Sequence, residues 1–339
     1  YAQTVSKPSN GRRLRVVVVG AGMSGLTAAR TLSDQGHDVV VVEKSRGPGG
    51  RMSTRRKGDL RFDHGAQYFT ARDPRFRRHV VAWQERGLVE HWDARIGAVS
   101  VDTIEAVGHG TDRYMPVPSM NEVCRELMKD LEDCRFGWQA DSFEFEINTW
   151  NVQSNTRDIV EGDALILTAP PEQVRSLLPH SEVEAVLQPL EMRPCWAVMA
   201  VLDKPLFTDW DAAFVNHGPL SWVSGQAARP GRPKADAWLL HAGPDWSQAH
   251  LEDNHEMVCD LLLEAARQLP GAQQFKVLDA DAHRWRYALA REALNQGAFW
   301  FEPKRLAIAG DWCYGSKVEG AFLSGMAAAG RIMGAGSNF

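Results

Sequence analysis

The chain has 339 residues, of which 24% are charged and 44% are hydrophobic, a balance typical of a soluble globular protein. Its formal net charge of -5 argues against nucleic acid or an anionic membrane as the main partner. The five cysteines are odd in number and form no C-x-x-C pair, so neither a disulfide framework nor a zinc site is indicated and a reducing, cytoplasmic location is expected. No run reaches transmembrane length, and the polar leader, residues 1–13, lacks an apolar signal core.

The first predicted element is a strand over Leu14–Val19, an unbroken apolar run of the kind that a strand buried on both faces requires. Gly20, Gly22 and Gly25 follow at G-x-G-x-x-G spacing, and helical signals cover Ser24–Ser33. Glycines at this spacing allow a tight turn, close approach of the backbone to a pyrophosphate, and close packing of a helix on a strand. The pattern therefore predicts a dinucleotide-binding βαβ unit.

A second apolar strand, Val39–Val42, ends at Glu43, an acid placed to accept hydrogen bonds from a ribose. Gly49, Gly50 and Arg51 come soon afterwards. A second close backbone approach beside a cationic fork suits a second contact with the same diphosphate. We therefore expect two glycine turns to hold one dinucleotide.

The continuation is more specific. It reads GGRMSTRR from Gly49 to Arg56 and FDHGAQYF from Phe62 to Phe69. This resembles renalase and its bacterial relatives, within the flavin amine oxidase superfamily, which carry a similar G-G-R-M-[ST]-T followed by G-A-Q-Y. The resemblance implies that the dinucleotide is FAD.

Further along, Asp73 and Pro74 predict the start of a helix that Gly87 ends, with one buried stripe at Phe76, Val80 and Trp83. The remaining predicted elements are strands within 92–107, a capping box and helix over 119–132, a half-exposed strand or hairpin over 143–152, a buried strand over 163–168, strands over 194–202 and 237–242, a solvated proline-rich loop over 229–234, and the longest helix over 252–269.

Near the C-terminus an apolar strand, Leu306–Ala309, precedes Gly310 and Asp311, and a helix with small residues starts at Val318. By resemblance this is the second half of the flavin site. A reduced flavin carries negative charge on its pyrimidine edge, which a helix N-terminus would stabilise through its unpaired N–H groups. Cys313 does not match the covalent linkage site of monoamine oxidases, so FAD is expected to be non-covalent.

The resemblance implies an α/β fold: a Rossmann-type FAD-binding domain, amine-oxidase and p-hydroxybenzoate-hydroxylase-like, and a second α+β substrate domain on a mixed or antiparallel sheet. The FAD-binding domain is expected to comprise residues 12–75, 155–180 and 276–339, and the substrate domain residues 76–154 and 181–275. The expected cofactor-binding residues are Gly20, Gly22, Met23, Ser24, Gly25, Glu43, Lys44, Gly50, Arg51, Met52, His64, Gly65, Ala66, Gln67, Asp311, Val318, Glu319, Gly320 and Ala321.

The substrate-side candidates have counterparts in renalase-like sequences: Gln67 and Tyr68 in HGAQYF, His241 in WLLHA, and Trp285 and Arg286 in HRWRYA. A glutamine amide can orient a carboxamide, and a Tyr or Trp ring can stack on a flat heterocycle. Each also has a plain structural interpretation, as a packed loop residue, a satisfied strand histidine or a solvent-facing ion pair. No Ser-His-Asp or metal constellation stands out.

The leading hypothesis is a renalase-like FAD oxidase. Such enzymes oxidise 2- or 6-dihydro isomers of NAD(P)H, and dioxygen takes the electrons as hydrogen peroxide. The scarcity of lysines favours an electron-rich donor, since many amine oxidases use a lysine-bound water beside the flavin. The alternatives are a flavin amine oxidase or desaturase with another substrate, and a non-catalytic binding protein on the scaffold of guanine-nucleotide dissociation inhibitors. The sequence leaves the oligomeric state open.

Overall fold

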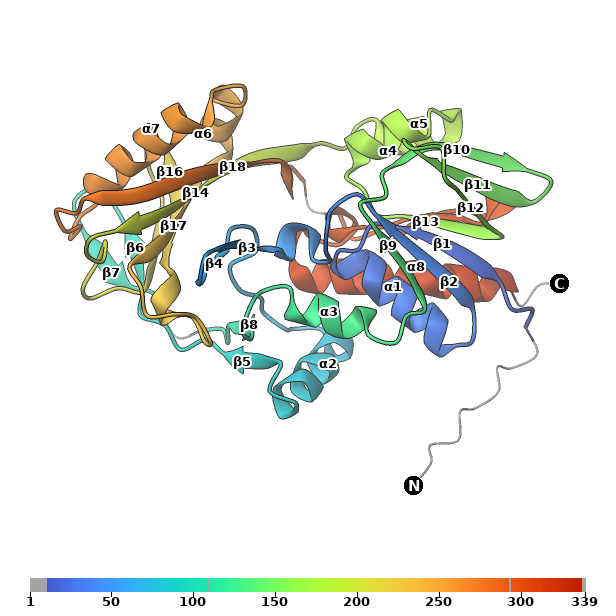
Figure 1. The fold of residues 1–339 in the computed structure, drawn as a ribbon, viewed down its shortest axis with the longest axis horizontal. Coiled ribbons are helices and arrows are strands. Elements are labelled where there is room, and N and C mark those ends of the chain that lie inside the picture. The colour runs from blue at the N-terminus through green and yellow to red at the C-terminus, as the bar shows by residue number, and fades with distance from the viewer. Residues whose placement is uncertain (1–10, 109, 293, 337–339) are drawn as a thin grey trace. The chain divides into compact units, whose positions relative to one another are not determined.

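A computed structural model describes residues 11–108, 110–292 and 294–336 (Figure 1). The chain forms two compact units. Among the described residues, unit 1 comprises those up to Gly50, those within Cys124–Glu191 and those from Ala290 onward, and unit 2 comprises those within Arg51–Val123 and Met192–Leu289. The boundaries of these compact units differ from the expected domain boundaries. Residues 51–75 and 276–289 lie in unit 2, while 124–154 and 181–191 lie in unit 1.

Unit 1 contains a six-stranded sheet of strand order β19-β20-β13-β1-β2-β9. Its strands are β1 (Arg15–Val19), β2 (Asp38–Glu43), β9 (Asp133–Phe136), β13 (Ala164–Leu167), β19 (Phe299–Phe301) and β20 (Leu306–Ile308). All neighbours are parallel except β19 and β20, which are antiparallel. The centres of β1, β2, β13 and β20 are buried, as the apolar runs in the sequence predict for a sheet covered on both faces. The edge strands β9 and β19 are only partly buried.

Helices α1 (Met23–Asp34) and α8 (Val318–Gly336) pack side by side in unit 1 (Figure 1). Gly325 makes this close approach possible, since a Cβ there would lie 2.3 Å from the Ser24 carbonyl oxygen. The two helices that open the two predicted halves of the cofactor site are therefore held against each other.

Unit 1 also contains α4 (Pro171–Leu177), α5 (Ser181–Leu187) and an antiparallel sheet of β10 (Ala140–Glu146), β11 (Thr149–Ser154) and β12 (Ile159–Gly162). The first two strands of this sheet, β10 and β11, are the predicted hairpin.

Unit 2 contains a seven-stranded mixed sheet of order β18-β14-β17-β16-β15-β6-β7. Its strands are β6 (Ile96–Val99), β7 (Ile104–Ala106), β14 (Met192–Leu202), β15 (Ala212–Val215), β16 (Leu220–Gly225), β17 (Ala237–Ala242) and β18 (Val277–Ala290). One apolar cluster joins this sheet to α7 (His255–Arg267), which follows α6 (Pro244–Ala249). A second cluster joins Ala197, Met199 and Leu239 to Phe62, on the hairpin of β3 (Thr54–Lys57) and β4 (Leu60–Asp63).

The other elements of unit 2 are α2 (Pro74–Glu85) and the strand pair β5 (Val89–His91) and β8 (Tyr114–Pro116). Asp73 caps α2 by accepting from the Arg75 amide, as predicted, and Phe76, Val80 and Trp83 are buried.

The predicted helix over 119–132 is wrong in length: α3 (Glu122–Met128) is shorter, because Asp130 takes a positive φ of 68° before the chain enters β9. The longest helix is α8 and not the one before Pro270. No helix within the described ranges is long and apolar enough to cross a membrane.

Candidate functional site

The three glycines of the first turn differ in the space around them. Gly20 has a φ of +108°, and a Cβ on it would lie 2.1 Å from the Thr168 hydroxyl. A Cβ on Gly25 would lie 2.0 Å from the Gly20 carbonyl oxygen. Both glycines are thus required by the protein's own packing. Gly22 differs: its Cβ would meet nothing closer than 3.9 Å, so this position is open to close approach by a ligand.

The second glycine turn lies against the first. Gly22 forms a parallel bridge with Gly49, whose amide donates to the Ala21 carbonyl at 2.9 Å. The Ser24 hydroxyl, in the first turn of α1, is buried and has no hydrogen-bond partner among the described residues. The open space at Gly22, the N–H groups at the start of α1 and the unpaired Ser24 hydroxyl together fit the diphosphate of a dinucleotide. Met23, also an expected cofactor residue, is buried beside them.

Glu43 ends β2 and points its carboxylate at the first turn. One oxygen accepts from the Ala21 amide at 2.7 Å and the other from the Ser45 amide at 2.8 Å. A carboxylate has about four acceptor positions, so two remain for ribose hydroxyls. Glu43 therefore shapes the turn and keeps free acceptor positions of the kind that a ribose would need. Lys44, by contrast, is exposed.

The C-terminal element has the expected strand, turn and helix. Gly310 has a φ of +158° and donates its amide to the Ser324 hydroxyl on α8 at 3.0 Å. Asp311 is buried in the turn, and its backbone carbonyl accepts from the Tyr314 and Ser316 amides. The start of α8 packs tightly on this turn, since a Cβ on Gly320 would lie 2.2 Å from the Tyr314 carbonyl. Val318 and Glu319 begin the helix, but the Ala321 amide already donates to the Lys317 carbonyl and is not available to a ligand.

Cys313, the cysteine nearest to this turn, is buried. Burial raises the pKa of its thiol above the ordinary range. A buried, protonated thiol is a poor nucleophile, which agrees with a cofactor that is held without a covalent bond.

In unit 2, the short 3-10 helix that ends at Met52 packs against the start of the HGAQY loop, defined here as His64–Tyr68. The Ala66 amide donates to the Arg51 carbonyl at 2.8 Å, and a Cβ on Gly65 would lie 2.0 Å from that carbonyl oxygen. The Arg51 guanidinium donates to the Ala288 carbonyl at 2.9 Å. The sequence, which suggested a contact with the diphosphate, did not indicate this hydrogen bond within the protein.

Three separate sequence motifs meet at one atom of this loop. The carbonyl oxygen of His64 is 2.8 Å from Trp285 Nε1 and 2.9 Å from His241 Nε2. Because a carbonyl only accepts, the proton of neutral His241 is assigned to Nε2. The structure therefore brings together the HGAQY loop, which follows β4, and the WLLHA and HRWRYA segments of β17 and β18.

The amide of Gln67 is fully used inside the protein. Its nitrogen donates to the carbonyls of Asp63 and Gly65, and its oxygen is 3.1 Å from Trp222 Nε1 and 3.4 Å from Arg229 Nη1. Both hydrogens and the oxygen have protein partners, so these contacts favour a positioning role for Gln67 over the expected contact with substrate.

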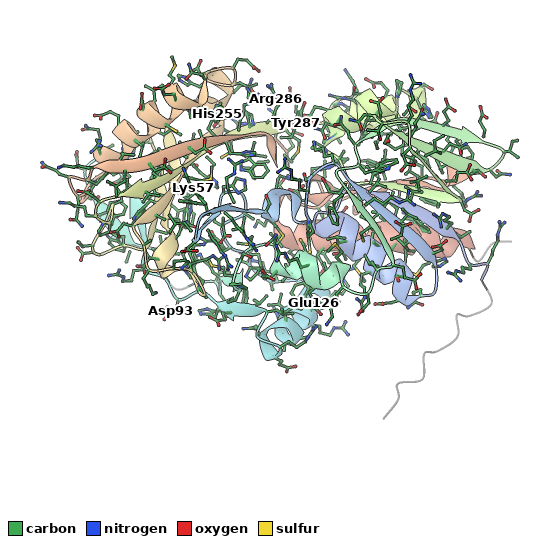
Figure 2. The ribbon with its side chains drawn as sticks, in the orientation of Figure 1. Lys57, Asp93, Glu126, His255, Arg286 and Tyr287 are labelled. Atoms are coloured by element: carbon green, nitrogen blue, oxygen red, sulfur yellow. The ribbon has the colours of Figure 1, made fainter. Side chains whose placement is uncertain are left out.

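Trp285 and Arg286 do not share a face, because successive side chains of a strand point in opposite directions. Trp285 reaches the HGAQY loop, whereas the Arg286 guanidinium is 2.9 Å from Glu252. In Figure 2, Arg286 and His255 lie on one side of β18 and Lys57 on the other. Arg286 is thus a partly exposed ion-pair member, the interpretation that the sequence had left open, and is not among the residues at the loop.

A buried ion cluster contacts the HGAQY loop, and the sequence analysis did not predict it. Asp63, Arg229 and Arg232 have no exposed side-chain surface. Arg229 Nε is 2.9 Å from Asp63 Oδ2, and Arg232 binds the same oxygen. Asp63 Oδ1 accepts from the Thr54 hydroxyl at 2.6 Å and the Met120 amide at 3.2 Å. The prediction of a solvated loop over 229–234 is therefore wrong for Arg229 and Arg232, which are buried, although Gly231, Pro233 and Lys234 are exposed.

The charges of this cluster are stable near neutral pH. Burial on its own would raise the pKa of Asp63, but Arg229 and Arg232 outweigh it and hold that pKa below its usual value. Burial lowers the pKa of Arg229 to about 10, so it stays protonated. One carboxylate between two guanidiniums leaves an excess positive charge behind the loop.

The histidines near the loop are neutral. Burial, with His283 and Arg55 nearby, lowers the pKa of His64 to about 3. Burial and Arg55 lower the pKa of His283 to about 4, and Arg55 Nη2 lies 3.1 Å from His283 Nδ1. Burial also lowers the pKa of His241. Within the part of the chain that the structure describes, no group of His, Cys, Asp and Glu could hold a metal ion.

Aromatic rings gather around Tyr68. Its ring centroid lies 6.0 Å from that of Trp92 and 5.9 Å from that of Trp222, and Trp222 contacts Phe214 at 4.7 Å. Tyr68 is partly exposed. The ring cluster supplies flat apolar surface of the kind that a heterocyclic ligand needs.

Comparison with solved structures finds the same fold at low identity. A candidate protoporphyrinogen oxidase from Exiguobacterium sp. 255-15 is 13% identical, with a TM-score of 0.74 over 98% of this chain and 100% of that one. A putrescine oxidase with bound putrescine is 14% identical, with a TM-score of 0.70 over 95% of this chain and 99% of that one. These likenesses confirm the predicted fold class.

Among curated proteins, a 4,4'-diapophytoene desaturase (4,4'-diaponeurosporene-forming) of Staphylococcus aureus strain Newman is 42% identical over 52 residues, 15% of this chain. The match spans only 10% of that relative's length. An NAD(P)-binding Rossmann-like domain matches residues 18–82, and the family of flavin containing amine oxidoreductases matches residues 104–333, more than half of the chain. The predicted flavin cofactor is thereby confirmed, and the chain belongs to the flavin-containing amine oxidoreductase family.

Proposed function

We propose that this flavoprotein is an oxidase of isomeric dihydronicotinamide dinucleotides, the 2- or 6-dihydro forms of NAD(P)H. The donor would lose a hydride from its ring and leave as NAD(P)+. The chemistry that a bound flavin supplies is acceptance of that hydride and return of the electron pair to dioxygen, with hydrogen peroxide as the product.

The observation that carries the proposal is the convergence on the His64 carbonyl. His241 and Trp285 lie on different strands and reach the same backbone oxygen. Both residues belong to motifs that have counterparts in renalase-like sequences. Their meeting around one loop, which the sequence pattern alone could not require, supports a shared site of that kind.

Charge also favours this donor over an amine. An alkylamine is a cation near neutral pH, and it would meet the excess positive charge of the buried Asp63, Arg229 and Arg232 cluster. A dinucleotide is an anion and would be attracted by it. The flavin oxidoreductase family includes amine oxidation chemistry, so this electrostatic difference is the argument for a different substrate class.

The neutral histidines fit a reaction in which the donor gives up a hydride and no proton. His64 and His283 have pKa values of about 3 and about 4, too low for a general base working near neutral pH. Their roles would be to shape the site and to exclude water. Tyr68, and the rings around it, would hold the flat donor ring.

The test is anaerobic mixing of the purified protein with each candidate donor while flavin absorbance is followed. We expect the 2- or 6-dihydro isomer to bleach the flavin within seconds, with ordinary 4-dihydro NADH much slower. Bleaching by putrescine or another primary amine, without a response to the isomers, would overturn the proposal. A protein that stays colourless after incubation with FAD would instead favour the non-catalytic alternative, which the family match does not support.

A further inference from the structure

Arg113 is held beside the HGAQY loop by the backbone. Its carbonyl accepts from the Trp92 amide at 2.7 Å. The next residue, Tyr114, exchanges two hydrogen bonds with Phe69, at 3.0 and 2.8 Å. Phe69 directly follows Tyr68, so these bonds fix the backbone of Arg113 next to the tyrosine of the motif.

The side chain of Arg113 lies over that tyrosine. Its Cζ is 5.2 Å from the centroid of the Tyr68 ring, within the range of a cation–π contact. Arg113 as a whole residue is partly buried, yet its guanidinium forms no ion pair or hydrogen bond with a carboxylate of the described residues. Its neighbour Asp112 instead bonds His91 at 3.1 Å. The carboxylate of Asp63 is already occupied by two other arginines.

A partly buried guanidinium without an anion loses hydration that a ring contact replaces only in part. The planar fork can stack on a ring and still present N–H donors in its plane to a phosphate. From this geometry we propose that Arg113 binds a phosphate of the substrate nucleotide, while the neighbouring Tyr68 contacts its flat ring. The inference rests on the proposed function and extends it, since it makes the phosphate, and not only the dihydronicotinamide ring, part of what is recognised.

The test compares three forms of the reactive dihydro isomer: the riboside without phosphate, the mononucleotide with one phosphate, and the dinucleotide with a diphosphate. Anaerobic flavin reduction gives a rate and an apparent Kd for each form. In the unaltered protein the ratio of the reduction rate to the apparent Kd should be about 10- to 100-fold higher for the phosphorylated forms than for the riboside, the range expected for a charge-assisted hydrogen bond. Arg113→Gln should remove that advantage and leave the riboside within about twofold. Arg113→Lys, which keeps the charge without the planar fork, should fall between.

Arg78 provides the matched control, because it is an exposed arginine on α2 for which the structure gives no ion pair among the described residues. Arg78→Gln should leave all three donors unchanged. An effect of Arg113→Gln on the dinucleotide alone would also support the proposal, and would assign the contact to the adenylate-side phosphate. Equal loss for all three donors, or no loss at all, would overturn the Arg113 assignment and leave the proposed function standing. Failure of every isomer to reduce the flavin of the unaltered protein would overturn both.

Discussion

The carboxylate of Asp63 and the guanidinium of Arg229 form an ion pair in which neither side chain has any exposed surface. Asp63 ends β4 at the entrance to the HGAQY loop, and Arg229 also reaches the Gln67 amide oxygen and backbone carbonyl. A buried ion pair is weak evidence for stability, since desolvation cancels much of the attraction. We interpret its main role as fixing the loop in one position.

Breaking this pair should nevertheless be costly, because the Asp63 carboxylate would lose one of its two buried guanidinium partners and the Gln67 carbonyl would lose its donor. Arg229→Met is expected to lower the free energy of unfolding by about 1.5–3 kcal/mol, the range for a buried hydrogen bond to a charged group. The matched control is Arg291→Met, since the Arg291 and Glu191 side chains are 65% and 60% exposed and such a pair contributes about 0–1 kcal/mol. Urea denaturation of both variants measures the difference. A cost of Arg229→Met no larger than that of the control would contradict the burial of this pair.

The arginine cluster also shows why the prediction of a solvated loop over 229–234 was wrong. Prolines, a glycine and three cations over 229–234 are typical of a solvated loop, and Lys234 is indeed exposed. The available signal was Asp63, an acid at the end of an apolar strand that would need a partner if buried. The partner lies 166 residues away in the chain, and a pattern of local residues does not identify contacts at that separation.

The N-terminal cofactor elements could be predicted because their chemistry is local. Strand, glycine turn, helix and acid follow one another within Leu14–Glu43, and the structure has each of them. The sequence did not separate the roles of the glycines, because the space around each depends on distant residues such as Thr168. It likewise grouped Trp285 with Arg286, where strand alternation places them on opposite faces.

This difference between the glycines can be tested directly. Gly22→Ala should fold normally, since its nearest neighbour would be at 3.9 Å, but should weaken flavin retention on the order of tenfold or more by filling the space for the diphosphate. Gly25→Ala should instead destabilise the protein by about 1–3 kcal/mol, because its Cβ would lie 2.0 Å from the Gly20 carbonyl oxygen. Flavin absorbance after gel filtration and thermal unfolding separate the two effects. A Gly22→Ala protein that stays fully yellow would mean that this turn does not contact the cofactor.

Glu43 offers a second test of the same site. Glu43→Arg should abolish flavin retention, because a cation would replace the acceptor for ribose hydroxyls and for the Ala21 and Ser45 amides. Glu43→Gln, which keeps one acceptor oxygen, should lose only part of the retention. Titration of the flavin-free proteins with FAD, followed by flavin fluorescence, gives both values. Equal affinity of Glu43→Arg and the unaltered protein would show that the acid has been misassigned.

Trp285 and Arg286 should differ in their effect on catalysis although they are adjacent. Trp285→Phe removes the hydrogen bond to the His64 carbonyl, a loss of about 0.5–1.5 kcal/mol, and should slow flavin reduction by up to about tenfold. Arg286→Gln disrupts only a partly exposed pair with Glu252 and should stay within about twofold. Single-turnover reduction by the active donor compares them. A larger effect of Arg286→Gln would restore that residue to the site.

The stability of the fold should depend on the neutral histidines. In the unfolded chain a histidine binds a proton below a pKa of about 6.5, whereas the folded values for His64 and His283 are about 3 and about 4. Between these values the unfolded state binds more protons, so stability must fall as the pH falls from about 6.5 toward 4. Each histidine can contribute at most about 1.4 kcal/mol per pH unit, less for the more exposed His283. His283→Gln removes one of these groups and should flatten the decline measured by urea denaturation from pH 7.5 to 4.5. His79→Gln, on the exposed face of α2, is the control and should leave the decline unchanged. An equally steep decline in His283→Gln would show that His283 is not held neutral by the fold.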